Sequence, residues 1–97
     1  MNSWLESIYS DGTREFISNP SPALFETVTI KLRMYKDAPV NHVFIRSLRN
    51  GMENIQEMKL TKTKRDLAYY EVPLKITENR IQYHFYIVCE DVIYFYT

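Results

Sequence analysis

The last third of the chain is the feature that most limits its fold. Residues 81–89 read IQYHFYIVC, and residues 92–96 read VIYFY. Both runs are rich in β-branched and aromatic residues, and only Glu90-Asp91 separates them. Such residues fit a pleated, partly buried surface, so we expect a hairpin of two long strands. Because the second strand runs to the last residues, we also expect this chain to be cut from a longer protein.

Length and charge narrow the class of protein. The chain has 97 residues, which is enough for one core, so we expect a single domain over residues 1–97. Twelve basic residues balance twelve acidic ones, which gives no field to attract nucleic acid or an anionic membrane. No apolar run approaches the roughly 20 residues that span a bilayer. The N-terminal residues do not have the pattern of a signal peptide, and the chain has a single cysteine. Both observations favour a cytoplasmic protein.

The clearest alternation lies in residues 27–34. Val28, Ile30, Leu32 and Met34 share one face, and polar residues take the other, which predicts a half-buried antiparallel strand. Residues 41–49 predict the next strand, and Asn50-Gly51 after it is a strong hairpin signal.

Two further segments carry mixed signals. Residues 53–64 combine helical and strand spacing of their apolar residues, and we interpret them as a strand because of their threonines and the hairpin context. Residues 68–75 predict another strand, which Pro73 restricts to a sheet edge or a bulge because proline lacks an N–H.

The whole pattern predicts an all-β fold. Residues 8–10 also predict a short strand, which brings the count to seven or eight strands with turns roughly every 8 to 12 residues, as in an antiparallel β-sandwich. The expected core is formed by six side chains from two sheets: Val28, Ile30, Leu32, Tyr83, Phe85 and Ile87.

Catalytic and metal-binding chemistry find little support. His42 and His84 lie on predicted strands, on the face opposite the core, and Cys89 is the sole thiol. A zinc site takes three or four ligands at suitable spacing, and nothing here provides them. The paired carboxylates fall in turns or on solvated faces. We therefore expect no catalytic residue, no metal and no cofactor, and we expect Cys89 to be a small core residue.

Outward-facing aromatic residues are the remaining candidates for function. Those that fall off the predicted inner series, or in the termini, are Trp4, Tyr35, Phe44, Tyr69, Tyr86, Tyr94 and Tyr96. Three interpretations stay open: a strand preference without function, an interface with a domain or subunit, and stacking on sugars. Our candidate contact residues, for carbohydrate or for an interface, are Trp4, Tyr35, Phe44, Tyr69 and Tyr86.

The order of these segments resembles a known family. The segments that carry the resemblance are Ile8-Tyr9-Ser10, Asn19-Pro20-Ser21-Pro22, residues 28–33, residues 43–46, Met58-Lys59, residues 69–72, residues 81–86 and Tyr94-Phe95-Tyr96. Together they resemble the N-terminal immunoglobulin-like domain, of the carbohydrate-binding module family thirty-four type, in α-amylase superfamily enzymes. The nearest group comprises neopullulanases, cyclomaltodextrinases and maltogenic amylases.

The resemblance implies a non-catalytic accessory domain of an α-glucan-degrading glycoside hydrolase. Its implied partners are the catalytic barrel of the same polypeptide, a second subunit in a homodimer of the full-length enzyme, and α-glucan through weak contacts. The catalytic carboxylates belong to the barrel, so the domain alone is not expected to be an enzyme. The alternative is an immunoglobulin-like protein-interaction domain unrelated to carbohydrate.

Overall fold

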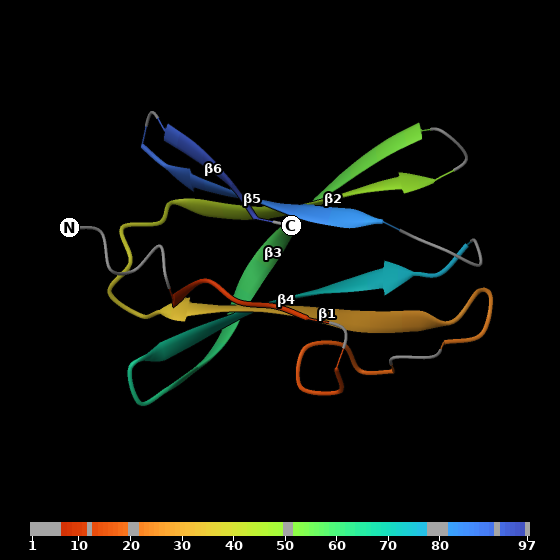
Figure 1. The fold of residues 1–97 in the computed structure, drawn as a ribbon, viewed down its shortest axis with the longest axis horizontal. Coiled ribbons are helices and arrows are strands. Elements are labelled where there is room, and N and C mark those ends of the chain that lie inside the picture. Colours follow the sequence, from red (N-terminus) through yellow and green to blue (C-terminus); the bar gives the residue numbers. More distant parts are fainter. Residues whose placement is uncertain are drawn as a thin grey trace.

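A computed structural model of the chain describes residues 7–11, 13–19, 22–49, 52–77, 82–90 and 92–96. These residues form six strands (Figure 1). The strands are β1 (Thr27–Tyr35), β2 (His42–Arg49), β3 (Met52–Lys64), β4 (Leu67–Lys75), β5 (Tyr83–Cys89) and β6 (Val92–Tyr96).

The strands form one antiparallel sheet in the order β1-β4-β3-β2-β5-β6, and this sheet folds over on itself. The long strand β3 makes the fold possible. Its first half, through Met58, pairs with β2, and its second half, from Lys59, pairs with β4. Figure 1 shows β3 crossing from the layer of β2, β5 and β6 to the layer of β1 and β4. The predicted immunoglobulin-like β-sandwich is therefore confirmed.

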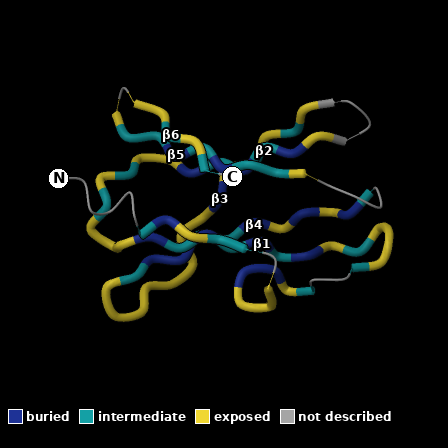
Figure 2. The backbone as a smooth tube through the Cα atoms, viewed as in Figure 1, coloured by how far each residue is buried: buried dark blue, intermediate teal, exposed yellow. Residues whose placement is uncertain are grey.

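The core lies between the two layers, where the alternation in β1 placed it. Val28, Ile30, Leu32 and Met34 are fully buried, and Phe85 and Ile87 meet them from the opposite layer. Tyr83, expected among them, is half-buried and packs against the cluster. Figure 2 shows the buried segments recurring along β1 and β4. Burial of these apolar side chains is the main force that holds the layers together.

The strand count differs from the seven or eight expected. Residues 8–10 and 14–17 lie along β1 but form only isolated bridges, Tyr9 with Arg33 and Ile17 with Ile30. Between the bridges the chain leaves β1 and makes a turn, in which the amides of Phe16 and Ile17 donate to the carbonyl of Thr13. The turn interrupts what the apolar pattern alone presents as a strand.

The interpretation of residues 53–64 as a strand is confirmed, and its mixed signal has a structural cause. Met58 is buried, whereas Ile55 and Leu60 are exposed. The register with β4 also shifts between Leu60 and Lys62. Met58 and Leu60 lie on the inner face, opposite Val43 and Tyr70, whereas Ile55 lies on the outward face. Apolar residues thus occur on both faces of β3, so they keep no single period.

Pro73 shows how a proline fits a strand in mid-sheet. It pairs with Thr29 of β1, but the main-chain groups of Thr29 bond to Ser18 on the other side of β1. The main-chain groups of Pro73 therefore point toward β3, whose register with β4 ends at Glu71. β4 is thus an edge locally, as predicted, and the missing N–H costs no ladder bond.

The β2–β3 and β5–β6 hairpins turn at the positions that the sequence predicts. Arg49 pairs with Met52 across Asn50-Gly51, two residues that lie outside the described part of the chain, as does Ile81. Cys89 pairs with Val92, and Glu90 between them has a φ of 53°, as a two-residue hairpin turn requires.

Candidate interaction surface

Three aromatic rings form a row across the outward face of β2, β5 and β6. Phe44 pairs with Tyr86, and Tyr86 pairs with Phe95, so the three side chains lie side by side on one face of the sheet. The Tyr86 and Phe95 rings meet edge to face, with centroids 4.9 Å apart. We call Phe44, Tyr86 and Phe95 the aromatic row.

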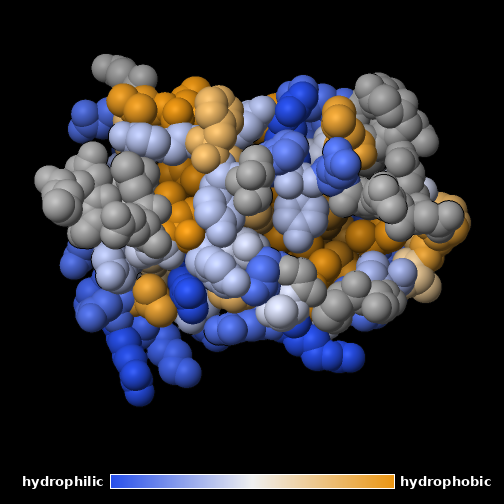
Figure 3. All heavy atoms as spheres, viewed as in Figure 1, coloured by the Kyte–Doolittle hydropathy of each residue, from blue (hydrophilic) through white to orange (hydrophobic). Residues whose placement is uncertain are grey.

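Exposed aliphatic residues extend this surface. Phe95 is 68% exposed and Ile93, beside it on β6, is 53% exposed. Ile55 and Leu48 add exposed apolar side chains at the opposite end of the same face. In Figure 3, apolar side chains gather at the β5–β6 end of the molecule. Arg46 and His84 separate Ile55 and Leu48 from the aromatic row. Exposed apolar patches of this kind are the usual mark of an interaction site.

Ion pairs border the aromatic row on its β3 side. His42 Nδ1 lies 2.8 Å from Glu57 Oε2, and Arg46 Nη2 lies 2.8 Å from Glu53 Oε2. The hydrogen bond with Glu53 raises the pKa of Arg46 above its ordinary value. Because the pairs are solvated, they contribute little to stability. They instead give the apolar surface a polar rim, which is the anatomy of a protein interface.

Two of the five predicted contact residues meet on this surface: Phe44 and Tyr86. Tyr35 is exposed, but it lies at the end of β1 in the other layer. Tyr69 lies on the outward face of β4, as the alternation predicts, but its neighbours cover it. Its side chain is 9% exposed, between Arg33 and Lys62 on the neighbouring strands, and the Lys62 ammonium lies 5.0 Å from its ring centroid. Trp4 lies outside the described residues.

The two faces of β6 are the reverse of those expected from the sequence. Tyr94 and Tyr96, expected to face outward, are half-buried and pack against the core, whereas Ile93 and Phe95 face outward. The hairpin register could have revealed this. Cys89 opposite Val92 places Tyr94 across from Ile87, and directly paired residues share a face. Since Ile87 was already assigned to the core, Tyr94 had to join it.

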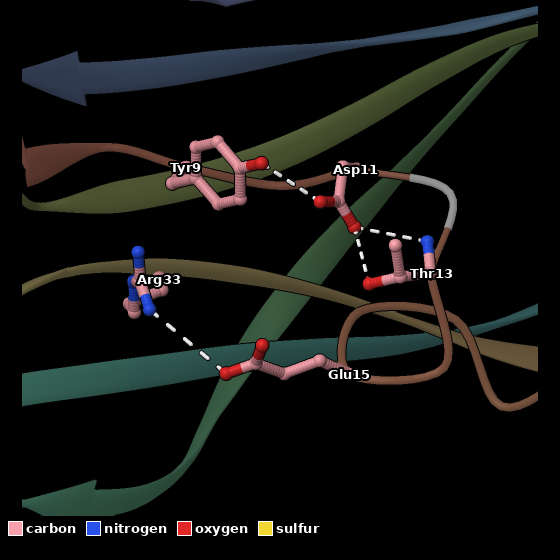
Figure 4. Close-up of polar contacts among 5 residues, drawn as sticks. All are labelled: Tyr9, Asp11, Thr13, Glu15 and Arg33. Carbon is pink, nitrogen blue, oxygen red and sulfur yellow. Dashed lines mark hydrogen bonds and ion pairs between the residues drawn. The ribbon is translucent and has the colours of Figure 1, made fainter.

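A second cluster lies where the N-terminal segment meets β1 (Figure 4). The Arg33 guanidinium carbon is 5.2 Å from the Tyr9 ring centroid and 5.4 Å from that of Phe16. Its Nη1 is 3.9 Å from Glu15 Oε1. Phe16 is 1% exposed, so Arg33 and Tyr9 cover a small apolar centre on the outer side of the sheet.

Asp11 organises the turn beside that cluster. Its Oδ2 accepts a hydrogen bond from the Tyr9 hydroxyl at 2.7 Å, and its Oδ1 accepts from the amide and the hydroxyl of Thr13 (Figure 4). The bonds from Thr13 are the main reason that the pKa of Asp11 is lowered, and the bond to Asp11 raises the pKa of Tyr9. Both carboxylate oxygens are occupied, so Asp11 has a structural role.

The described residues show no grouping of side chains that suits a metal ion. Among the described residues, no three His, Cys, Asp or Glu side chains are grouped as a metal site requires. Cys89 is partly buried against the core, and burial raises the pKa of its thiol. The part of the chain that the structure covers also holds no helix with the length and hydropathy needed to cross a membrane.

The fold and this surface define the class of protein: an immunoglobulin-like β-sandwich with an exposed aromatic face. The family follows from sequence comparison. The sequence model of the α-amylase N-terminal immunoglobulin-like domain matches residues 5–97, so the chain belongs to this family. It is the N-terminal, non-catalytic type of domain in α-amylase family enzymes.

Comparison with solved structures agrees at the level of fold. Among 21 matching chains, a cyclomaltodextrinase superimposes with a TM-score of 0.80 at 18% sequence identity. The match covers 97% of this chain and 16% of that one, so the chain spans about a sixth of the cyclomaltodextrinase. A comparison with curated proteins finds no match.

Proposed function

We propose that residues 1–97 act as the N-terminal accessory domain of an α-glucan-degrading glycoside hydrolase in the cytoplasm. In this proposal the domain has no catalytic role. It packs through the outward face of β2, β5 and β6 against the catalytic barrel or a partner subunit, and thereby shapes access to the active site. Family membership and the aromatic row support the proposal.

The aromatic row is the observation that carries the proposal. An isolated strand residue as exposed as Phe95 is unremarkable, but Phe95, Tyr86, Phe44 and Ile93 form one continuous surface. Water contact with this surface is unfavourable, and covering it releases roughly 25 cal/mol per Å² of apolar area. The polar rim of Arg46–Glu53 and His42–Glu57 can then face solvent or polar groups of the partner.

The binding test separates the domain from its barrel. The chain and the barrel encoded by the same gene are produced as two polypeptides, and their association is measured by isothermal titration calorimetry. Phe95→Ser should weaken binding at least tenfold, because aromatic residues at the centre of an interface are typical hot spots. Phe25→Ser is the matched control, since Phe25 is 67% exposed but lies in the loop before β1. Equal effects of the two substitutions would contradict the proposed interface.

The same surface supports a second part of the proposal, weak contacts with α-glucan. Flat rings stack on the apolar faces of sugars, and Arg46 and His42 beside the row can donate to hydroxyl groups. Titration with maltooligosaccharides should shift amide NMR signals of β2, β5 and β6 and leave those of β1 and β4 in place. Absence of shifts at millimolar sugar removes this part and leaves the packing role. Hydrolysis of maltodextrin by the isolated chain would contradict the accessory role itself.

The alternative is an immunoglobulin-like interaction domain that has no connection with carbohydrate. The outward face fits it equally well, since an apolar surface with a polar rim suits many protein partners. The coding sequence downstream of Thr97 separates the two. A (β/α)₈ barrel pattern there supports the glycoside hydrolase, and its absence favours the alternative.

A further inference from the structure

The outward face of β1, β4 and the second half of β3 is rich in lysine. Among the described residues at the outward positions of these segments, Glu71 is the only carboxylate. In Figure 3, hydrophilic side chains project from the lower edge of the molecule, where Figure 1 places β1 and β4. We call the lysines of this surface the basic face; they are Lys31, Lys59, Lys62, Lys64 and Lys75.

A β-bulge gathers the lysines of β3 on this face. The register of β3 with β4 shifts at this point because Thr61 is an extra residue. In an unbroken register Lys62 would oppose Ala68, which is buried, and would face the core. The bulge instead turns Lys62 and Lys64 outward, on the same face as Lys59. The local geometry of β3 thus concentrates positive charge on one side of the sandwich.

The charge of the basic face is not balanced by its neighbours. Glu15 pairs with Arg33, which lies beside the lysines on β1, and Glu71 accepts a hydrogen bond of 2.8 Å from the Thr61 hydroxyl. Within the described part of the chain, none of the five lysines forms an ion pair. The whole chain is formally neutral, so its charges are segregated. Segregated charge creates a local positive potential that the net charge does not reveal.

Edge protection explains only part of this arrangement. Lysines along the free edge of a strand hinder pairing with a foreign strand, and this accounts for the lysines of β3. Lys31 needs another explanation, because it lies in mid-sheet. Its residue pairs with Glu71 of β4 on one side, and its amide donates to the Phe16 carbonyl of the N-terminal segment on the other.

The basic face offers a partner charge rather than stacking. Tyr69 at its centre is 9% exposed and lies under Lys62, whose Nζ is 5.0 Å from the ring centroid. Adjacent strands are about 4.8 Å apart, so one anion can contact ammonium groups from two strands. A phosphate monoester suits this arrangement, because it carries a charge of about −1.5 to −2 at pH 7. Lysine binds phosphate as a compact point charge.

We propose that the basic face binds α-glucan that carries phosphate monoesters. This inference rests on the proposed function, because an accessory domain of an α-glucan-degrading enzyme meets α-glucan chains. A polymer with phosphate groups along its length matches cations that are spread over three strands. Figure 1 shows the two layers of the sandwich, whose outward faces point in opposite directions. The aromatic row can therefore be covered by the barrel while the basic face holds phosphorylated glucan.

An NMR titration of the chain tests the proposal. The probes are a maltooligosaccharide phosphorylated at one 6-hydroxyl, its unphosphorylated parent, and inorganic phosphate. The phosphorylated sugar should shift the amide signals of β1, β4 and residues 59–64, which the parent leaves in place. Its binding should be roughly tenfold weaker in about 0.5 M than in about 0.05 M sodium chloride, because salt screens exposed charges. Equally tight binding of inorganic phosphate would mean an adventitious ion only and would refute the proposal.

Substitutions locate the binding site. Lys59→Gln and Lys62→Gln should each weaken binding of the phosphorylated sugar about fivefold, whereas Lys59→Arg and Lys62→Arg should keep it, because arginine also binds phosphate. Lys36→Gln is the matched control, since Lys36 is exposed but lies in the turn after β1. It should leave binding unchanged. An equal loss in Lys36→Gln and Lys62→Gln would contradict the proposed site.

The remaining outcomes separate this inference from the proposed function. Shifts of β1 and β4 by the unphosphorylated parent would refute phosphate recognition, and tighter binding of duplex DNA than of the phosphorylated sugar would make the face a nucleic-acid site instead. Loss of barrel binding, or absence of shifts in β2, β5 and β6, would count against the aromatic row alone. The basic face has its own readout in β1, β4 and residues 59–64.

Discussion

The left-handed turn before β1 allows a test of backbone strain by substitution. Phe25 and Phe95 are nearly equally exposed, 67% and 68%, but Phe25 has a φ of 68° and Phe95 lies in the strand β6. Each is replaced by alanine and by glycine. The difference between the two variants at one position cancels the loss of the aromatic side chain, including the Lys75 contact with Phe25 and the Tyr86 contact with Phe95.

The expected magnitudes follow from the two conformations. In β6, glycine should be less stable than alanine by about 0.5–1 kcal/mol, because it loses more conformational freedom on folding. At position 25 alanine bears the left-handed penalty of about 1–2 kcal/mol, which glycine avoids. The glycine-minus-alanine differences at the two positions should therefore differ by about 1–2 kcal/mol, with glycine favoured at position 25.

Urea denaturation of the four variants measures this difference. With a slope of about 1 kcal/mol per M, as expected for a domain of this size, it corresponds to a shift of roughly 1–2 M between the paired midpoint differences. The same preference for alanine at both positions would refute the reasoning, since it would mean that residue 25 does not experience left-handed strain in solution.

Three further predictions concern the core, the Asp11 turn and the thiol. Ile30→Ala should lower the free energy of unfolding by about 2–5 kcal/mol, because Ile30 is fully buried, whereas Ile55→Ala at an exposed site should cost under about 1 kcal/mol; equal losses by urea denaturation would contradict the core assignment. The folded pKa of Asp11 lies below its ordinary 3.8, so Asp11 stabilises the fold above that pH and loses this effect as the pH falls through the folded pKa. Asp11→Asn should therefore flatten the dependence of the free energy of unfolding on pH in this acid range. An unchanged pH dependence would contradict the stabilising role of Asp11. Because burial, and then Glu90, raise the pKa of Cys89, its alkylation by iodoacetamide near pH 8 should be slower in the folded chain than in urea; equal rates would rule this out.

Local alternation predicted the parts of the fold that stay in one layer. Val28 to Met34 keep one face buried throughout, so their pattern alone gave the strand and its orientation. Pro73 likewise predicted a position where β4 is an edge, and the pairing of β4 with β3 indeed stops short of it. This prediction holds in any tertiary context because proline has no N–H to donate to a neighbouring strand.

The features that the sequence did not reveal depend on contacts between distant segments. Tyr69 alternates like an outward residue, but Arg33 and Lys62 on neighbouring strands cover it. Residues 7–19 bind the edge of β1 partly through serine hydroxyls, which apolar periodicity cannot show. The sequence predicted two residues of the aromatic row, Phe44 and Tyr86. The third, Phe95, can be placed on the same face only from the register of the β5–β6 hairpin.

The proposed packing requires that the outward face of β2, β5 and β6 is covered in the full-length enzyme. The most direct measurement is the alkylation rate of a thiol at position 95, in Phe95→Cys with Cys89→Ser, in the isolated chain and in the intact enzyme. A thiol at position 25 serves as the reference for overall access. We expect position 95 alone to be protected in the intact enzyme, and equally fast alkylation of position 95 in both proteins would refute the proposed packing.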